Sequence, residues 1–258
     1  FSIMSHDKPA KEMSLGGHLD ELRKRMLSSL LFLGILFFVF WLGFAEELKA
    51  IFMHPHLEAV DSLLAYEPPI IIDRRLVLHS PLEDVFYTLK VCFLSSVILS
   101  LPVLLYHVWG FISAGLYRKE KIAVLKYIPF SLLFAFSGIA FGYIFMIPTI
   151  LEFLYAMPNS DLVLQAYRLE YYFSLFMMFT LALSLVFQLP IVMLGICASG
   201  LVSPEVFIKY RKYFVLFAFV LSAILTPPEP ISQLLMALPT IMLFEIGILL
   251  VRVQKNIK

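Results

Sequence analysis

The side chains in this sequence that could bind a charged ligand are carboxylates set among basic residues. Glu21 lies four residues before Arg25, and Glu120 is the only acid within residues 118–121, which read Arg-Lys-Glu-Lys. A carboxylate can hold the planar guanidinium of a ligand's arginine through two parallel hydrogen bonds. Each glutamate could instead serve local charge balance, because a Glu–Arg pair at i,i+4 contributes about 0.2–0.5 kcal/mol to a helix. The pattern leaves both interpretations open.

Two further polar side chains lie inside long apolar runs. Gln188 falls in the middle of one run, and Glu245 lies seven residues before Arg252 in another. An amide in hydrocarbon needs a hydrogen-bond partner, so Gln188 either joins helices of this chain or anchors the transmembrane helix of a partner protein. Glu245 could be ion-paired, or it could extend its carboxylate toward water at a membrane interface.

The sequence contains no motif of catalysis or of metal binding. A P-loop, an HExxH pair, a Gly-x-Ser-x-Gly elbow and a metal-spaced Cys/His set are all absent from it. Cys92 and Cys197 both lie in apolar runs, where a thiol packs as a small hydrophobic group. His54 and His56 flank Pro55, and we interpret all three as loop residues. The sequence therefore predicts no catalytic residue, no metal ligand and no cofactor.

The elements that position these residues must cross a membrane. Of 258 residues 60% are apolar and 15% are charged, whereas a soluble domain has about 25% charged residues. A soluble protein of this size cannot bury so much apolar surface. A bilayer core about 30 Å thick needs about 20 helical residues to cross it. We expect an all-α polytopic membrane protein with six spans: 26–45, 91–116, 127–151, 173–202, 213–226 and 231–251.

Capping and turn residues separate these spans. Ser80, Pro81 and Glu83 have the types and spacing of an N-cap, a first-turn proline and a capping-box glutamate, so a helix begins there and runs into the second span. Residues 203–205 (SPE) begin another helix in the same way. Residues 226–230 hold three prolines and must interrupt the helix. The last two spans therefore form a tight hairpin, and we expect both to be too short for an unperturbed bilayer.

The basic residues indicate how the chain is oriented. Fifteen of the 20 Lys and Arg residues lie in four segments: 1–26, 115–126, 203–212 and 252–258. The remaining five lie in the loops on the opposite side of the predicted spans. Cytoplasmic loops of membrane proteins are enriched in Lys and Arg. The sequence therefore predicts that both termini are cytoplasmic.

The same pattern predicts a single membrane domain. We expect residues 1–13 to form a flexible N-terminal segment and residues 14–252 to form the six-helix domain. Residues 46–90 would be a long external loop, and residues 253–258 a cytoplasmic tail. No internal repeat is evident, which argues against the inverted-repeat architecture of many transporters.

Several segments of the chain together resemble the TatC family, the multi-spanning core subunit of the twin-arginine protein translocase. The family patterns are HL-x-ELR-x-R, P-x-x-x-Y-Q-x-W-x-F-I, A-LY-x-x-E, TPPD-x-x-SQ, A-x-P and (Y/F)EI. The matching segments, in chain order, are HLDELRKR (18–25), LPVLLYHVWGFI (101–112), LYRKE (116–120), TPPEPISQ (226–233), ALP (237–239) and FEIG (244–247). The match runs from about residue 14 to 252, with the expected spans between the segments.

This resemblance implies a function that composition does not show. TatC proteins form a concave, cupped bundle and bind the twin-arginine signal peptides of proteins that are exported in the folded state. They work with single-span partners of the TatA and TatB type, and the proton-motive force drives transport. By matched position, Glu21, Arg23 and Glu120 fall on the signal-peptide site and Phe111 on its supporting surface. Pro55 matches the family's loop proline after the first span.

The chain departs from the family pattern at three positions. Gln188 stands where the family has Glu, as the polar group inside the concave membrane face. Glu229 stands where the family has Asp, and His107 where it has Gln. The resemblance marks Glu229, together with Glu245 and Pro55, as structural or partner-contact residues.

The sequence thus supports a non-enzymatic receptor for protein export. We expect a multi-pass protein of the bacterial cytoplasmic (inner) membrane that forms a hetero-oligomer and binds no nucleic acid. The alternative is a secondary transporter for a small solute, which should show repeats or several ionisable groups at mid-membrane depth. An intramembrane enzyme is a third class, and it would need a nucleophile–base or metal motif.

Overall fold

The structure is a computed structural model. It describes residues 15–67, 69–70, 72–114, 126–157, 167–198, 200, 202–226 and 230–257. The expected flexible segment 1–13, Glu120 and Glu229 lie outside the described residues.

Helices make up nearly all of the described chain. In order they are α1 (Leu15–Gly43), α2 (Ala45–Leu63), α3 (Pro81–Ala114), α5 (Tyr127–Phe141), the π-helical turn η1 (Gly142–Met146), α6 (Ile147–Ala156), α7 (Leu169–Val186), α8 (Leu189–Ala198), α9 (Pro204–Leu225) and α10 (Pro230–Ile257). The only β-type pairing among the described residues is an isolated bridge between Val77 and Arg168. The expected all-α fold is confirmed.

Five helical segments of the described chain are long and apolar enough to cross a membrane. They are Leu19–Gly43, Pro81–Phe111, Tyr127–Ala156, Leu169–Ala198 and Pro230–Gln254. Helix α9 is not among them, because Lys209, Arg211 and Lys212 lie within its first turns. A multi-pass membrane protein is confirmed, whereas a sixth span formed by α9 stays a prediction.

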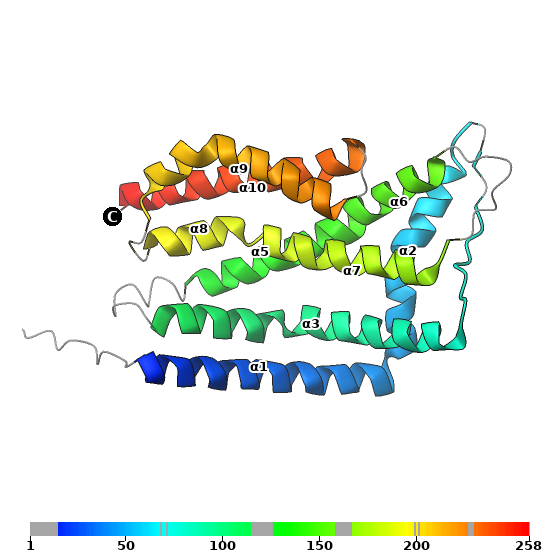
Figure 1. Ribbon diagram of the computed structural model, residues 1–258, viewed down its shortest axis with the longest axis horizontal. Coiled ribbons are helices and arrows are strands. Elements are labelled where there is room, and N and C mark those ends of the chain that lie inside the picture. Colours follow the sequence, from blue (N-terminus) through cyan, green and yellow to red (C-terminus); the bar gives the residue numbers. More distant parts are fainter. Residues whose placement is uncertain are drawn as a thin grey trace, which may run out of the picture.

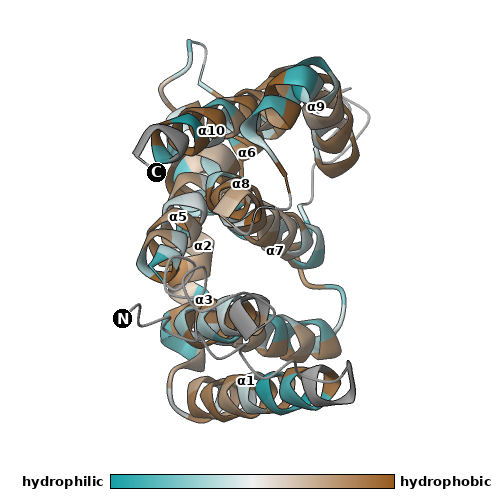
Figure 2. Cartoon of the chain, turned by 90° about the vertical axis from the view of Figure 1, so that its left-hand side faces the viewer, coloured by the Kyte–Doolittle hydropathy of each residue, from teal (hydrophilic) through white to brown (hydrophobic). Residues whose placement is uncertain are grey.

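The helices form a curved row and not a closed ring. Seen along the helix axes, α1 and α3 lie at one end of the row and α10 and α9 at the other, with α5, α7 and α8 between them (Figure 2). Consecutive members of this row contact one another: α1 with α3, α3 with α5, α5 with α7, α8 with α10, and α10 with α9. Helix α1 therefore packs mainly on α3, and most of its apolar surface stays exposed.

The two ends of the molecule differ in what they contain. The start of α1, the ends of α3, α8 and α10, and the start of α9 lie at one end (Figure 1). Helix α2, the start of α3 and the end of α6 lie at the other end. The basic residues at the start of α1, in the first turns of α9 and at the end of α10 belong to the first of these ends, which we call the basic end. The end that contains α2 is called the α2 end below.

Residues 46–90, which the sequence predicts to be an external loop, are more regular than expected. Helix α2 occupies the first part of this segment, so the interpretation of His54, Pro55 and His56 as loop residues is wrong. Proline has no N–H to donate to the carbonyl four residues earlier, which here belongs to Ile51. The hydroxyl of Tyr143 donates to that carbonyl instead, at 2.8 Å. A tertiary contact thus supplies the bond that proline removes, and the sequence of α2 alone does not reveal it.

The predicted span 173–202 is not one continuous helix. Helix α7 ends at Val186, and α8 begins at Leu189 after a turn at Phe187 and Gln188. Pro190 explains the interruption, because its ring clashes with a continuing helix and it donates no hydrogen bond to the turn before. The two helices together remain long enough to form one span.

The hairpin at residues 226–230 begins and ends as expected. Helix α9 ends at Leu225 and α10 begins at Pro230. The expectation that both helices are too short is wrong for α10, which is a candidate span. In α9, the part beyond Lys212 is charge-free and spans only about 20 Å at 1.5 Å per residue. Figure 1 shows that the hairpin ends short of the ends of α6 and α7, so it is recessed at the α2 end.

The main hydrophobic core lies toward the α2 end, where α2 closes over α6 and α7. Phe52 of α2 packs on Phe173 and Phe176 of α7, and its ring centroid lies 4.8 Å from that of Phe176. The hydroxyl of Tyr172 donates to the Phe52 carbonyl. We call α2 together with residues 72–80 the α2 cap. The bridge between Val77 and Arg168 fastens this cap to the start of α7, because Val77 N–H donates to the Tyr167 carbonyl at 2.9 Å.

His56 is fully buried inside the α2 cap, and both of its ring nitrogens are hydrogen-bonded. Nε2 lies 3.2 Å from the carbonyl of Arg74, which can only accept, so Nε2 carries the proton. Nδ1 then accepts from the hydroxyl of Tyr155, at 2.8 Å. The neutral imidazole therefore satisfies this network, and a protonated ring does not.

We predict that the α2 cap loosens as the pH falls below about 6.5, the ordinary pKa of histidine. Burial lowers the pKa of His56 in the folded protein, and the bond to the Arg74 carbonyl opposes that effect only partly. Because the pKa of His56 is lower in the folded state, the unfolded chain takes up a proton more readily. The stability that neutral His56 contributes is therefore fully present above pH 6.5 and is lost as the pH falls toward the pKa of the folded state. Hydrogen exchange of α2 amides at pH 7.5 and pH 5.5 measures this. The exposed His54 is the control, and His54→Gln should keep the acid sensitivity. An equally protected α2 at both pH values would contradict the prediction.

We also predict that the α2 end is external and the basic end cytoplasmic. A cysteine placed at Asp61 lies on the exposed face of α2 and removes only a surface ion pair with Arg74. A membrane-impermeant thiol reagent should label it from outside the cell. Labelling only from the cytoplasmic side would overturn the orientation.

Candidate functional site

Glu21 and Arg25 lie one turn apart on α1, on the side that faces α3. One carboxylate oxygen of Glu21, Oε1, accepts from both Nε and Nη2 of Arg25, at 3.0 and 2.5 Å. The two side chains are about one-quarter exposed. The second oxygen, Oε2, is buried and has no hydrogen-bond partner among the described residues. Glu21 therefore forms the local pair and keeps one oxygen available to a further donor.

Gly110 of α3 makes room for this pair. A Cβ atom added to Gly110 would overlap the guanidinium of Arg25. The guanidinium thus lies close to the backbone of α3, where a larger residue would displace it. This close approach explains a glycine in the interior of a long helix, a position where glycine is otherwise unfavourable by about 0.5–1 kcal/mol relative to alanine.

A second polar contact joins α1 to α3 one turn further along. His107 Nδ1 lies 2.8 Å from the carbonyl of Arg25 and 2.9 Å from Ser29 Oγ. Because the carbonyl can only accept, the Nδ1 proton points toward it. Ser29 Oγ also donates to that carbonyl, at 2.9 Å. These bonds fix the position of α1 against α3 at its basic end.

A groove of about 420 Å³ lies between the two helices beside these contacts. We call it the α1–α3 groove. Arg25, Ser29 and His107 provide its polar part, and Phe111 lies at one side. Apolar side chains form the rest of the wall: Leu22, Met26, Leu27, Leu30, Leu33, Leu104 and Val108. The groove can hold an extended or helical apolar segment, with a carboxylate one turn beyond its end.

The structure brings only some of the predicted site residues together. Phe111 lines the α1–α3 groove, and Glu21 lies just outside it, one residue before Leu22 of its wall. Arg23 is exposed on α1 and lies about 200° around the helix from Glu21, so it faces away from the pair. Glu120 lies outside the described residues, although residues 112–114 at the end of α3 precede it at the same end of the molecule.

Gln188 lies at the turn between α7 and α8 and is bonded within the chain. Its Nε2 donates to the carbonyl of Ser131 on α5 at 2.8 Å, and its Oε1 accepts from the Ser131 hydroxyl. Trp109 of α3 donates its indole N–H to the same hydroxyl, at 3.0 Å. This network joins α3, α5 and the α7–α8 turn. It agrees with the interpretation in which Gln188 joins helices of this chain. Anchoring of a partner's helix stays a prediction.

The remaining predicted residues take structural positions. Glu245 on α10 pairs with Arg211 on α9 at 2.5 Å, so the carboxylate in an apolar run has a counter-charge in the neighbouring helix. Pro55 is buried in α2 and faces the core below the cap. Glu229 lies outside the described residues. A role for these three residues in contacting partners stays a prediction.

Sequence reasoning missed Gly110 and Ser29 as parts of the site. A lone glycine and a lone serine in apolar helices carry little information by themselves. The available signal was His107, a polar residue in an otherwise apolar stretch, and Arg25, the last charge before the first apolar run. Their pairing needed the register between α1 and α3, which the sequence does not give.

We predict that Gly110→Ala gains none of the stability that alanine usually adds to a helix, because its methyl group displaces Arg25 from Glu21. Gly34 of α1 is the matched control, since a Cβ there meets nothing within 4 Å. Gly34→Ala should stabilise the protein by about 0.5–1 kcal/mol. In an Arg25→Ala background, Gly110→Ala should stabilise by a similar amount. Thermal unfolding in detergent measures all three, and an equal gain at both glycines in the unaltered protein would contradict the proposed contact.

We predict that Gln188→Leu lowers stability by about 1 kcal/mol, the scale of a hydrogen bond between membrane helices. Ser131→Ala should lower it similarly, and the double variant should lose less than the sum, because the two side chains share one interaction. Unfolding midpoints of the four proteins give this coupling. An additive pair, with partner crosslinking lost in Gln188→Leu alone, would assign Gln188 to a partner's helix instead.

Comparisons of the sequence with known proteins all point to one family. Residues 17–239 match the family model described as Sec-independent protein translocase protein (TatC). The chain is 32% identical to TatCy of Bacillus subtilis over 93% of this chain and 89% of that protein. It is also 32% identical to TatC of Escherichia coli K12, over 90% of this chain and 85% of that one.

Solved structures agree with the sequence comparisons. A crystal structure of the twin-arginine translocase receptor TatC in the detergent DDM superposes with a TM-score of 0.74 and 31% sequence identity. The match covers 91% of this chain and 99% of that one. The curved row of helices is therefore similar to a fold already observed by crystallography.

Proposed function

Because the chain belongs to the TatC family of Sec-independent protein translocase proteins, we propose that Glu21 and the α1–α3 groove bind the signal peptides of its substrates. The chain is a multi-pass protein of the bacterial inner membrane and a component of the Tat translocase, which works with other Tat subunits. The solved relatives are named twin-arginine translocase receptors.

The observation that supports this proposal most strongly is the state of the Glu21 carboxylate. Arg25 uses one of its oxygens, and the other is buried without a partner among the described residues. A buried acceptor without a donor is unfavourable, so an incoming N–H donor gains the full value of the new bond. Arginine supplies such donors in a planar fork, whereas lysine supplies them from a single point.

Two adjacent arginines require a second carboxylate. Glu120 follows α3 at the basic end, and the predicted topology places it on the cytoplasmic side with Glu21. The basic residues around both acids repel a ligand that is merely cationic. Only a ligand that forms bidentate pairs gains enough to bind. We assign Arg23, which is exposed, to this surrounding basic field.

We propose that the α1–α3 groove recognises a second part of the signal peptide, its apolar segment. Signal peptides follow their arginines with an apolar segment, and the wall from Leu22 to Leu33 on α1 and from Leu104 to Phe111 on α3 is mostly apolar. Lipid tails are as apolar as this wall, so the groove positions the apolar segment beside the carboxylates and adds little hydrophobic affinity of its own. The carboxylates then select for arginine.

The proposed role involves no covalent chemistry by this chain. We propose that it acts as a receptor and scaffold for TatA- and TatB-type single-span proteins, and that it uses neither metal nor cofactor. A solute transporter is the less favoured function, because the one amide near mid-membrane, Gln188, is occupied by Ser131 and the charged pair Arg211–Glu245 lies between α9 and α10.

We predict that Glu21→Gln and Glu120→Gln each weaken binding of a twin-arginine signal peptide modestly, by about 1 kcal/mol, because the amide oxygen still accepts a hydrogen bond but carries no charge. Glu120→Arg should abolish binding, because it adds repulsion. Crosslinking of the purified protein to twin-Arg and twin-Lys peptides measures the effect.

Asp20→Asn is the matched control, because Asp20 is an exposed acid of α1 beside Glu21. It should leave the preference for arginine unchanged. If the double variant Glu21→Gln/Glu120→Gln still prefers Arg-Arg over Lys-Lys as strongly as the unaltered protein, the two glutamates serve only local charge balance.

A further inference from the structure

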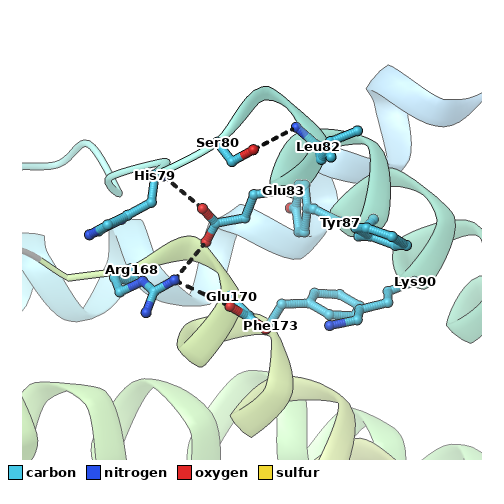
Figure 3. A pocket seen from close by; sticks show the side chains of 10 residues that line it. His79, Ser80, Leu82, Glu83, Tyr87, Lys90, Arg168, Glu170 and Phe173 are labelled. Carbon is cyan, nitrogen blue, oxygen red and sulfur yellow. Dashed lines mark hydrogen bonds and ion pairs between the residues drawn. The ribbon is translucent and has the colours of Figure 1, made fainter.

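A second pocket opens at the α2 end of the molecule, between the first turns of α3 and the start of α7 (Figure 3). Its volume is about 330 Å³. Glu83, Tyr87 and Lys90 line it from α3, and Arg168 lines it from the start of α7. We call it the α3–α7 pocket. It lies at the opposite end of the molecule from Glu21 and has no part in the proposed signal-peptide site.

Hydrogen bonds at the start of α3 position Glu83, which lines this pocket. Ser80 Oγ accepts from the N–H of Leu82 at 3.2 Å, and Glu83 Oε2 accepts from the N–H of His79 at 2.7 Å. Capping therefore occurs as the sequence indicates, with the glutamate reaching one residue further back than in a capping box. Figure 3 shows Glu83 held between His79 and Arg168. Arg168 Nη2 approaches Glu83 at 3.9 Å and Glu170 at 3.4 Å, so neither ion pair is tight.

Three polar atoms of this pocket are buried without a hydrogen-bond partner in the described part of the chain. They are Oε1 of Glu83, the hydroxyl of Tyr87 and Nε of Arg168. Tyr87 is only 5% exposed. Buried polar groups in native proteins are almost always satisfied, by protein or by a bound molecule. Arg168 Nη2 still faces Glu83 Oε1 at 3.9 Å, so the pocket combines loosely paired charges with two unpaired donors that a bound molecule can satisfy.

The fourth polar group of the pocket is a free cation. Lys90 is half-buried, and it makes no hydrogen bond or ion pair with any residue the structure describes. It is also the last charge before the apolar run 91–116, so its amine lies at the boundary of the hydrocarbon layer. Lipid phosphates lie just outside that boundary. The wall that faces outward is apolar, because Leu82 and Phe86 are 65% and 59% exposed.

The donors and acceptors of the pocket define the chemistry of its ligand. Lys90, Arg168 Nε and the Tyr87 hydroxyl can donate to a phosphate. Glu83 Oε1 can only accept, and its contact with Arg168 Nη2 at 3.9 Å is too long for a hydrogen bond, so it can take a donor from the same ligand. We propose that the α3–α7 pocket binds the headgroup of a membrane phospholipid that carries both a phosphate and a primary ammonium, as phosphatidylethanolamine does. Its acyl chains extend along α3 past Lys90 and the exposed Phe93, into the apolar run 91–116.

This chemistry distinguishes the ligand from related molecules. An anionic lipid such as phosphatidylglycerol offers the phosphate but places no cation against Glu83 and Glu170. Phosphatidylcholine has a cation whose methyl groups cannot donate a hydrogen bond. Inorganic phosphate lacks both the ammonium and the acyl chains that contact the apolar wall.

Native mass spectrometry of the delipidated protein tests the proposal. The protein is titrated separately with phosphatidylethanolamine, phosphatidylglycerol and phosphatidylcholine of identical acyl chains, and with inorganic phosphate as a competitor. We expect phosphatidylethanolamine to bind about tenfold more tightly than the other two lipids, the scale of one charge-assisted hydrogen bond. Inorganic phosphate should not displace it.

Two variants locate the binding without disturbing the fold. Lys90→Gln removes a side chain with no partner in the described chain, and Tyr87→Phe removes only an unpaired hydroxyl. Each should weaken phosphatidylethanolamine binding several-fold to about tenfold. Lys212→Gln, which alters an exposed lysine at the basic end, should change nothing. Equal binding of the three lipids, displacement by phosphate, or unchanged binding in both variants would overturn the proposal.

Discussion

Hydrocarbon offers no hydrogen-bond partner, and this constraint decides how the helices of the chain are joined. Among the described residues, several buried serines and threonines bond to a carbonyl of their own helix, whereas a few polar side chains bond across helices. Gln188, Ser131 and Trp109 join the α7–α8 turn to α5 and α3. His107 joins α3 to α1 through the Arg25 carbonyl. Apolar packing alone would allow these helices to slide, because lipid tails are as apolar as the side chains they replace. The polar contacts therefore fix the register on which both pockets depend.

The same constraint explains why the two ends of the molecule suit different ligands. Helix α1 packs on α3 alone along most of its length, so the groove between them stays open at the basic end and can admit an apolar segment from the side. The α2 cap closes the core at the other end, and His56 and Tyr172 saturate the carbonyls it brings inside. Polar atoms remain unsatisfied mainly at the rim of the cap, in the α3–α7 pocket. The fold thus places the α1–α3 groove at one end and the α3–α7 pocket at the other.

Local signals in the sequence predict much of this fold. Most features that they miss depend on contacts between helices far apart in the sequence. The cap at Ser80 and Glu83 and the break at residues 226–230 depend on local chemistry, and both were predictable. Helix α2 was missed, because Pro55 is compatible with a helix only where Tyr143 satisfies the carbonyl of Ile51. The break before Pro190 was overlooked within a long apolar run. Glu21 and its pairing with Arg25 were evident from spacing, whereas Gly110 and the internal partners of Gln188 required the packing of helices far apart in sequence.

Site-specific photocrosslinking shows most directly whether the α1–α3 groove holds the signal peptide. Val108 lines the groove and is 52% exposed, and Leu216 on α9 is 64% exposed and far along the row of helices. A photoreactive residue at each position is irradiated in the presence of a twin-arginine peptide. Binding in the groove predicts a crosslink from position 108 that an excess of unlabelled peptide removes, and none from position 216. A crosslink from position 216 with none from 108 would place the peptide elsewhere and contradict this assignment.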